Sequence, residues 1–183
     1  MEEVNKWKGN RREIGEDFFE TPVHAINPIL KYIPNGVKTI WEPTYGKGAI
    51  GNVLEDQGYN VIKTDKFPKT DDTSKFDFLT DMMEDDYDML IFNPPFSLKT
   101  QFLQKVVALN KPFMFICPTS IMETATRSAL INKHQISIIN LSNRINYVGK
   151  KGNKVFFPSV WVLGDNKGKL YYAEVNAPRI KKS

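Results

Sequence analysis

Short apolar runs alternate along this chain with stretches in which apolar positions recur at helical spacing. Apolar runs of strand length occupy residues 37–41, 60–64, 89–92, 113–117 and 136–141. Intervals of three and four between apolar residues predict helices at residues 22–31, 49–57, 99–109 and 121–133. Strands that alternate with helices favour a mostly parallel sheet with helices on both faces. The pattern therefore predicts an α/β fold.

The end of the chain departs from this alternation. Residues 155–157 and 160–163 are apolar, and a turn containing two glycines separates them from residues 169–173, which are apolar or aromatic apart from Lys169. Consecutive strands with a short turn between them are typical of a hairpin. We expect an antiparallel C-terminal hairpin at the sheet edge.

The first predicted helix carries its own start and break signals. Thr21 is suited to the N-cap and Pro22 to the first helical position. Pro28 lies inside the predicted helix, and a proline there removes a backbone hydrogen bond. We therefore expect this helix to be kinked or split.

The length of 183 residues favours one domain. We predict that the domain spans residues 18–176, after a polar and flexible segment at 1–17 and before a basic tail at 177–183. The apolar fraction of 41% and the charged fraction of 25% are ordinary for soluble proteins. No apolar stretch approaches the roughly 20 residues of a membrane span, and the N-terminus lacks an apolar signal segment. We expect a cytoplasmic protein, in a bacterium or an infected host cell.

Cysteine content limits the possible chemistry. Cys117 is the single cysteine, which excludes an internal disulfide and a cysteine-based zinc cluster. It lies in an apolar run, where a buried thiol is expected. We predict no metal site.

The candidate catalytic feature follows directly on the apolar run that ends at Phe92. It is the tetrapeptide Asn93, Pro94, Pro95 and Phe96. Two consecutive prolines restrict the backbone and end the strand abruptly. In open α/β sheets, ligands bind at the carboxyl ends of strands. A rigid amide oxygen, a nearby carbonyl and a flat ring suit the binding of the exocyclic amine of a planar base.

A glycine-rich loop between a strand and a helix is the second feature. Gly46, Gly48 and Gly51 fit the pattern G-x-G-x-x-G, which lets a backbone approach a nucleotide closely. The pattern also fits a dinucleotide site or a simple tight turn. Glu42 and Pro43 precede it, and a carboxylate at this position suits an ammonium or sulfonium ligand better than a pyrophosphate.

Acidic and aromatic residues follow the next strand. Asp65 lies about 20 residues after the glycine loop, where an acid that accepts ribose hydroxyls is expected. Lys66 and Phe67 come next, and Phe67 suits either adenine stacking or the core. Asp77 and Phe78 are candidates for the adenine end of a cofactor, with a turn between core aromatics as the alternative.

Net charge is +4, and basic residues gather in the segment 143–154. A basic loop with an aromatic residue suits contacts with phosphates and bases, although a solvated surface loop explains it equally well. The candidate nucleic-acid contacts are Arg144, Tyr147, Lys150, Lys151 and Lys154.

These motifs together resemble the S-adenosylmethionine-dependent amino-group methyltransferases, in particular those that methylate adenine N6 in DNA. The resemblance covers residues 18–163 and follows the motif order of the γ class. It identifies Phe19, Thr21 and Pro22 with the N-terminal cofactor motif, and the segment 42–48 with the glycine-rich motif. It likewise identifies Asp65 with the ribose-binding acid, Asp77 and Phe78 with the adenine end, and Asn93 to Phe96 with the catalytic motif that also borders the cofactor.

The resemblance implies a Rossmann-like methyltransferase fold, S-adenosylmethionine as cofactor and nucleic acid as partner, with DNA favoured over RNA. It also implies that Phe96 stacks on a target base flipped out of the duplex. The chain has no room for a separate target-recognition domain, and in this it resembles small methyltransferases of phages and other mobile elements. The oligomeric state is not predicted.

Several alternatives stay open. Related motifs occur in enzymes that methylate adenine N6 or guanine N2 in RNA, and in enzymes that modify a glutamine amide in protein. Phe96, in place of a tyrosine, favours the nucleic-acid enzymes over the glutamine enzymes. A non-catalytic methyltransferase-like module is a further alternative, which the intact Asn93 disfavours. A NAD-dependent dehydrogenase would explain the glycine loop but gives the two prolines no role.

Overall fold

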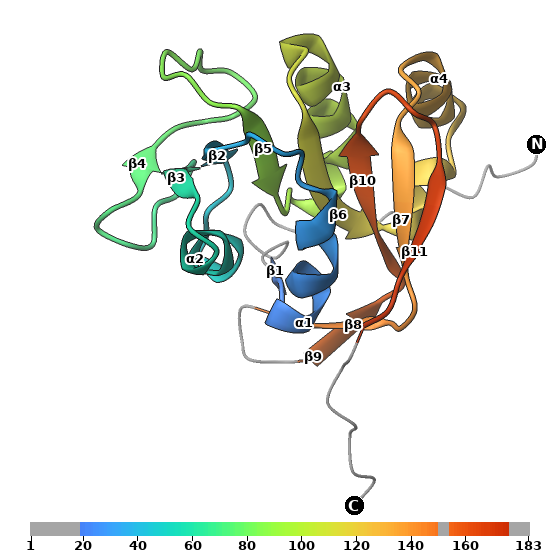
Figure 1. Cartoon of the computed structure of the whole chain (residues 1–183), viewed down its shortest axis with the longest axis horizontal. Helices are drawn as coiled ribbons and strands as arrows, with labels where there is room; N and C mark the ends of the chain where they lie inside the picture. Colours follow the sequence, from blue (N-terminus) through green and yellow to red (C-terminus); the bar gives the residue numbers. More distant parts are fainter. Residues whose placement is uncertain (1–18, 150–153, 176–183) are drawn as a thin grey trace, which may run out of the picture.

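The computed structural model describes residues 19–149 and 154–175, and an eight-stranded sheet forms its centre (Figure 1). The strand order of this main sheet is β11-β7-β10-β6-β5-β2-β3-β4. The strands are β2 (Thr39–Glu42), β3 (Asn60–Asp65), β4 (Ser74–Lys75), β5 (Met89–Phe92), β6 (Phe113–Pro118), β7 (Ser137–Leu141), β10 (Ser159–Gly164) and β11 (Leu170–Ala173). All are parallel except β10, which confirms the predicted mostly parallel sheet.

Helices and short 3₁₀ turns connect these strands. They are α1 (Val23–Ile26), η1 (Asn27–Tyr32), α2 (Ala49–Asp56), η2 (Phe96–Leu98), α3 (Lys99–Leu109), η3 (Thr119–Met122) and α4 (Ala125–Lys133). The connection through α2 leads from β2 outward to β3, whereas those through α3 and α4 lead the opposite way. Because parallel crossovers are right-handed, α2 covers one face of the sheet and α3 and α4 cover the other. None of the helices in the described segments is long and apolar enough to span a bilayer.

The strand order reverses between β2 and β5. The chain leaves β2 towards β3 on one side, and it leaves β5 towards β6 on the other. The helices therefore diverge at this point and leave a crevice at the carboxyl ends of the two strands. Both candidate motifs begin there, at Glu42 and at Asn93.

The first helix is split, as predicted. Its α-helical part ends at Ile26, and a 3₁₀ segment with Pro28 in its first turn continues to Tyr32. The prediction of Thr21 as N-cap is wrong. Pro22 holds the N-cap position, and its side chain has no atom that can form a hydrogen bond. The Thr21 hydroxyl instead accepts a hydrogen bond from Asn93.

The C-terminal strands run antiparallel to each other, as expected, but they do not pair with each other. β10 lies between β6 and β7, and β11 lies on the outer side of β7. Burial explains this arrangement. The residues from Ser159 to Leu163 are all buried and need neighbours on both sides, whereas Leu170 and Tyr172 of β11 are exposed, as an edge strand permits. The buried Trp161 Nε1 also donates to the Ala25 carbonyl at 2.9 Å and so ties β10 to α1.

A second, three-stranded sheet lies beside the main one. It consists of β1 (Phe19–Glu20), β8 (Ile145–Gly149) and β9 (Lys154–Phe157), in the order β1-β8-β9 with antiparallel pairing. The described part of the predicted basic loop, residues 143–149 and 154, therefore belongs mostly to strands β8 and β9. We call these three strands the small sheet.

Candidate active site

The side chain of Asn93 is held in one orientation. Its Nδ2 donates to the Phe19 carbonyl at 2.8 Å and to Thr21 Oγ1 at 3.0 Å. A carbonyl only accepts hydrogen bonds, so the amide nitrogen must face Phe19 and the amide oxygen must face away from it. Asn93 Oδ1 is buried and has no hydrogen-bond partner in the structure. Such an acceptor is costly unless a donor arrives, which makes the position a candidate ligand site.

Hydrogen bonds also hold the backbone of the candidate catalytic corner, residues Asn93 to Phe96. Thr44 Oγ1 donates to the Asn93 carbonyl at 2.9 Å, which links the glycine loop to the corner. Lys99 Nζ donates to the Phe96 carbonyl at 3.0 Å. Pro95 is extended, and the chain then turns into η2 at Phe96. The corner is therefore pre-formed on both sides of the two prolines.

Four aromatic side chains pack together next to this corner. We call Phe19, Phe96, Tyr147 and Phe157 the aromatic cluster. The rings of Phe19 and Phe96 are stacked, with centroids 5.3 Å apart and planes 20° apart. Tyr147 and Phe157 meet Phe96 edge-on at 5.6 Å and 5.4 Å. Phe96 was predicted to stack on a target base; in this conformation it is 7% exposed and Phe19 covers its ring.

The prediction for Tyr147 is also wrong in this conformation. We predicted a nucleic-acid contact, but its side chain is fully buried and its hydroxyl donates to Ser159 Oγ at 2.9 Å. Burial also raises the pKa of the Tyr147 hydroxyl. Of the other candidate contacts, Arg144 is exposed and Lys154 begins β9. Lys150 and Lys151 lie outside the described residues.

The end of β2, just before the glycine loop, brings a buried carboxylate to the same crevice. Glu42 is 1% exposed, and its Oε2 has no hydrogen-bond partner in the structure. Burial raises the pKa of the Glu42 carboxyl well above its usual range, and the nearby Asp65 and Glu55 carboxylates act in the same direction. A cation placed beside this carboxylate would reverse the effect. Pro43 is buried directly behind it.

Two glycines of the loop have distinct structural roles. Gly48 has φ +86° and is the N-cap of α2, a left-handed conformation that favours glycine. Gly51 has ordinary helical geometry but lies against Tyr45 and Glu42. A Cβ at Gly51 would overlap the Tyr45 ring and lie 2.8 Å from Glu42 Oε2. The third glycine of the motif is therefore required for packing.

Replacing Gly51 with alanine is expected to destabilise the protein by about 1–3 kcal/mol, the usual cost of overpacking. The sign of the change in the free energy of unfolding is diagnostic, because alanine in place of glycine inside a helix normally stabilises a protein by about 0.5–1 kcal/mol. Urea unfolding measures the difference, with the exposed substitution Gln104→Ala in α3 as control. A stabilised Gly51→Ala protein would show that Tyr45 moves away freely.

The candidate cofactor residues at and after the end of β3 make two separate sets of contacts. Asp65 Oδ2 accepts from the Gly46 N–H at 2.9 Å and Oδ1 from the Phe67 N–H at 2.8 Å, so its carboxylate borders the glycine loop. Lys66 pairs with Asp77 at 2.7 Å, which lowers the pKa of the Asp77 carboxyl. Phe67 is 60% exposed, which rules out its alternative as a core residue.

Phe78 does not lie at the surface. It is 2% exposed and stacks on Phe102 with centroids 5.0 Å apart, and its ring also packs against Trp41 and Phe92. The prediction that Phe78 contacts an adenine ring is therefore wrong for this conformation, because the α3 helix covers it.

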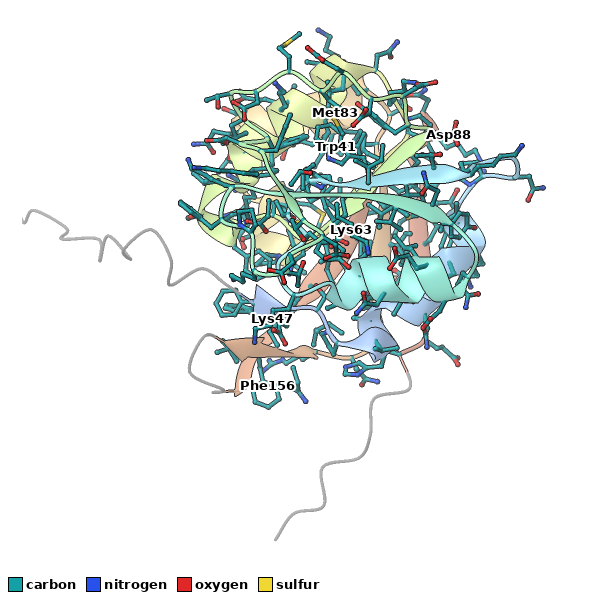
Figure 2. The ribbon with its side chains drawn as sticks, turned by 90° about the vertical axis from the view of Figure 1, so that its left-hand side faces the viewer. Trp41, Lys47, Lys63, Met83, Asp88 and Phe156 are labelled. Carbon is teal, nitrogen blue, oxygen red and sulfur yellow. The ribbon has the colours of Figure 1, made fainter. Side chains whose placement is uncertain are left out.

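One small cavity is lined by residues of the N-terminal, glycine-rich and Asn93 motifs. Its volume is about 30 Å³. The lining residues are Phe19, Glu20, Thr21, Glu42, Thr44, Tyr45, Lys47, Ala49, Ile50 and Asn93. Figure 2 shows Lys47 next to β1, and Lys47 Nζ forms an ion pair with Glu20 Oε1 at 2.9 Å. The structure thus brings the N-terminal, glycine-rich and catalytic motifs to one point.

Six residues that line this cavity were not predicted as site residues: Glu20, Thr44, Tyr45, Lys47, Ala49 and Ile50. Thr44 and Tyr45 lie inside the glycine-rich motif, where their polar side chains were a usable signal. Tyr45 is buried, its hydroxyl donates to Asn52 Oδ1 at 3.1 Å, and Lys63 Nζ lies 5.3 Å from its ring centre. The pairing of Lys47 with Glu20 had no local signal, because the two residues come from different motifs.

A larger cavity, of about 550 Å³, lies at the opposite end of the sheet. It is lined by residues at the starts of β5, β6 and β7, including Met89, Phe113 and Ile136. Ligands of open α/β sheets bind at the carboxyl ends of strands, so we assign the site to the smaller cavity. No group of three or more potential metal ligands occurs among residues 19–149 and 154–175.

Solved structures of methyltransferases share this fold. A candidate RNA methyltransferase from Pyrococcus horikoshii matches with a TM-score of 0.62 and 16% identity, over 86% of this chain and 91% of that chain. A predicted O-methyltransferase from Agrobacterium tumefaciens matches with a TM-score of 0.52 and 12% identity, over 83% and 85% of the two chains. A candidate class I S-adenosylmethionine-dependent methyltransferase from Listeria monocytogenes matches with a TM-score of 0.52 and 13% identity, over 85% and 63%.

These matches confirm the predicted Rossmann-like methyltransferase fold. No protein-family model matches the sequence, and no curated protein matches it. At such low identities, the similarity concerns the fold, and function has to be argued from the site.

Proposed function

We propose that this protein transfers a methyl group from S-adenosylmethionine to the N6 amine of adenine in nucleic acid, with DNA as the favoured polymer. The buried, unpartnered Oδ1 of Asn93 is the observation that carries the proposal. Its amide is oriented by Phe19 and Thr21, so the oxygen is ready to accept a hydrogen bond from an amine. A preorganised acceptor of this kind acts without rearrangement in the transition state.

The donor set of the crevice fits the cofactor. The buried Glu42 carboxylate would bind the ammonium group, and Asp65 would accept the ribose hydroxyls beside the glycine loop. Lys66, Phe67 and Asp77 would border the adenine end, where Phe67 offers an exposed ring. The cavity of about 30 Å³ is close to the volume of one water molecule, whereas small-molecule sites usually need roughly 300 Å³ or more. The cavity as it stands would therefore hold only part of the cofactor.

The chemistry follows from the two acceptors at the corner. S-adenosylmethionine supplies a methyl group activated by a sulfonium. Asn93 Oδ1 and the Pro94 carbonyl would accept the two amine hydrogens, which directs the nitrogen lone pair towards the methyl carbon. The bound cofactor would supply the methyl group with its thioether as the leaving group, and water would take the amine proton. The positive charge that develops on nitrogen is stabilised by the same acceptors.

RNA is the second candidate. The P. horikoshii protein is named for RNA methylation and has the highest TM-score of the three structures described above. DNA is favoured by the resemblance of the motif order to DNA adenine enzymes. The proposed cytoplasmic location and the origin from a phage or mobile element rest on the sequence alone.

Radiolabelled methyl transfer to unmethylated DNA, total RNA and a protein extract, measured side by side, tests the proposal. We expect incorporation into DNA, recovered as N6-methyladenine after hydrolysis. Incorporation into RNA alone would refute DNA as the substrate and support methylation of RNA. Incorporation into protein alone, or into none of the three, would refute a nucleic-acid methyltransferase.

A further inference from the structure

The ring of Phe19 is held like a planar base. It lies flat on Phe96, at 5.3 Å and 20°, and the edges of Tyr147 and Phe157 meet it at 6.1 Å and 5.2 Å. Stacking on one ring with edge contacts from others is a favourable environment for any flat π-system. Because Phe96 is only 7% exposed, a base has no access to this face of Phe96 while Phe19 is in place.

The Phe19 backbone has a separate role from its ring. The Phe19 carbonyl accepts from Asn93 Nδ2 and thereby orients the catalytic amide. This contact does not involve the side chain. The ring is therefore not needed to orient Asn93, and its position on Phe96 calls for another explanation.

The strand that carries Phe19 is short. β1 contains two residues, and its pairing with β8 consists of Phe19 opposite Gly149 and Glu20 opposite Val148. The ion pair of Glu20 with Lys47 is a further attachment, and the Lys47 side chain in it is 65% exposed. Exposed ion pairs contribute little to stability. The pairing with β8, the Glu20–Lys47 ion pair and the hydrogen bond from Asn93 to the Phe19 carbonyl do not involve the Phe19 ring, so the ring can move without the loss of these contacts.

We propose that Phe19 fills the target-base slot in the free protein and that a base enters by exchange with the Phe19 ring. The proposal rests on the proposed function in taking the occupant to be a nucleobase. Exchange selects for shape, since a flat ring regains the stacking on Phe96 and the edge contacts of Tyr147 and Phe157. The amide of a glutamine side chain would regain neither. Phe19 is thus a positioning residue that favours planar substrates.

The free base 2-aminopurine is a suitable probe, because stacking on aromatic side chains changes its fluorescence. Full-length Phe19→Ala is compared with the wild type. We expect the variant to bind the probe with a Kd about tenfold lower, since no stacked ring has to be displaced. Phe156→Ala is the matched control, because Phe156 is 48% exposed and projects from the small sheet away from the main sheet (Figure 2). Its Kd should equal that of the wild type.

An equal or higher Kd for Phe19→Ala, or no binding by either protein, would overturn the proposal. A second measurement covers the case in which Phe19→Ala does not fold. 4-Fluorophenylalanine at position 19 of the otherwise unchanged chain reports on the ring through its ¹⁹F resonance. We expect this resonance to shift as 2-aminopurine saturates the protein, and an unchanged resonance at saturation contradicts the exchange.

These readouts do not depend on methyl transfer. Tighter probe binding by Phe19→Ala, without methylation of any polymer by the wild type, would leave the exchange valid and refute the proposed function. Methylation by the wild type without tighter probe binding by the variant would support the proposed function and refute the exchange.

Discussion

Replacing Asn93 with alanine is expected to lower the rate of methyl transfer about 10²–10³-fold. The loss corresponds to about 2.7–4 kcal/mol of transition-state stabilisation, the usual effect of removing one preorganised hydrogen-bonding group. The physical reason is the buried Oδ1, which has no partner in the structure and is oriented by two hydrogen bonds from Nδ2. Steady-state kinetics with saturating cofactor measures the change in kcat.

Two further variants make this result specific. Thr21→Val removes one of the two acceptors that orient the amide and leaves the Phe19 carbonyl, so we expect a smaller loss of kcat than in Asn93→Ala. Asn132→Ala, an exposed asparagine of α4, should retain the wild-type rate. A wild-type kcat for Asn93→Ala would refute the proposed mechanism but would not contradict the assignment of the fold.

Local sequence signals were sufficient for the parts of the site that depend on single strand ends. Glu42, Asp65 and Asn93 were all predicted at the carboxyl ends of strands, and the structure places them at the ends of β2, β3 and β5. Parallel order brings such ends to one edge, so the convergence follows from the alternation of strands and helices. Their roles in binding and catalysis remain proposals.

The roles of aromatic residues were much harder to predict, because they depend on tertiary packing. Phe78 and Tyr147 were predicted to contact ligands, yet both are buried. Phe19 and Phe96 are far apart in the sequence, and nothing local indicates that their rings are stacked. An aromatic residue suits the core and a binding site equally well, and only the neighbours decide between the two.

Strand pairing at the C-terminal end illustrates the same limit. A short turn between two apolar runs predicts direct pairing, but β10 and β11 lie on opposite sides of β7. The fully buried β10 gains more from two neighbours than from an edge position. That gain depends on β6 and β7, which the local sequence around the turn does not contain.

Replacing Glu42 with glutamine is expected to stabilise the free protein and to weaken cofactor binding. The pKa of the Glu42 carboxyl is raised by burial, so the folded protein holds this proton more tightly than the unfolded protein does. Folded protein then binds more protons between the ordinary and the raised pKa, and its stability falls as the pH rises through this interval. Glutamine has no such proton, so the gain in free energy of unfolding of Glu42→Gln over the wild type should grow with pH.

Cofactor binding should change in the opposite sense. The ammonium group of S-adenosylmethionine favours the ionised carboxylate, so the wild type should release a proton on binding and bind more tightly as the pH rises. Glu42→Gln loses a hydrogen bond to a charged group, worth about 1.5–3 kcal/mol, or about 10- to 150-fold in affinity. Calorimetric titration across pH, in buffers of different ionisation enthalpy, measures both the affinity and the proton release.

The exposed substitution Glu174→Gln is the control and should alter neither property. An affinity for S-adenosylmethionine that is the same in Glu42→Gln and wild type at every pH would mean that the buried carboxylate does not bind the ammonium group. A stability difference without an affinity difference would make Glu42 a structural residue only. A loss of affinity together with a gain in stability is the combination expected of a charge that is buried in order to bind a cation.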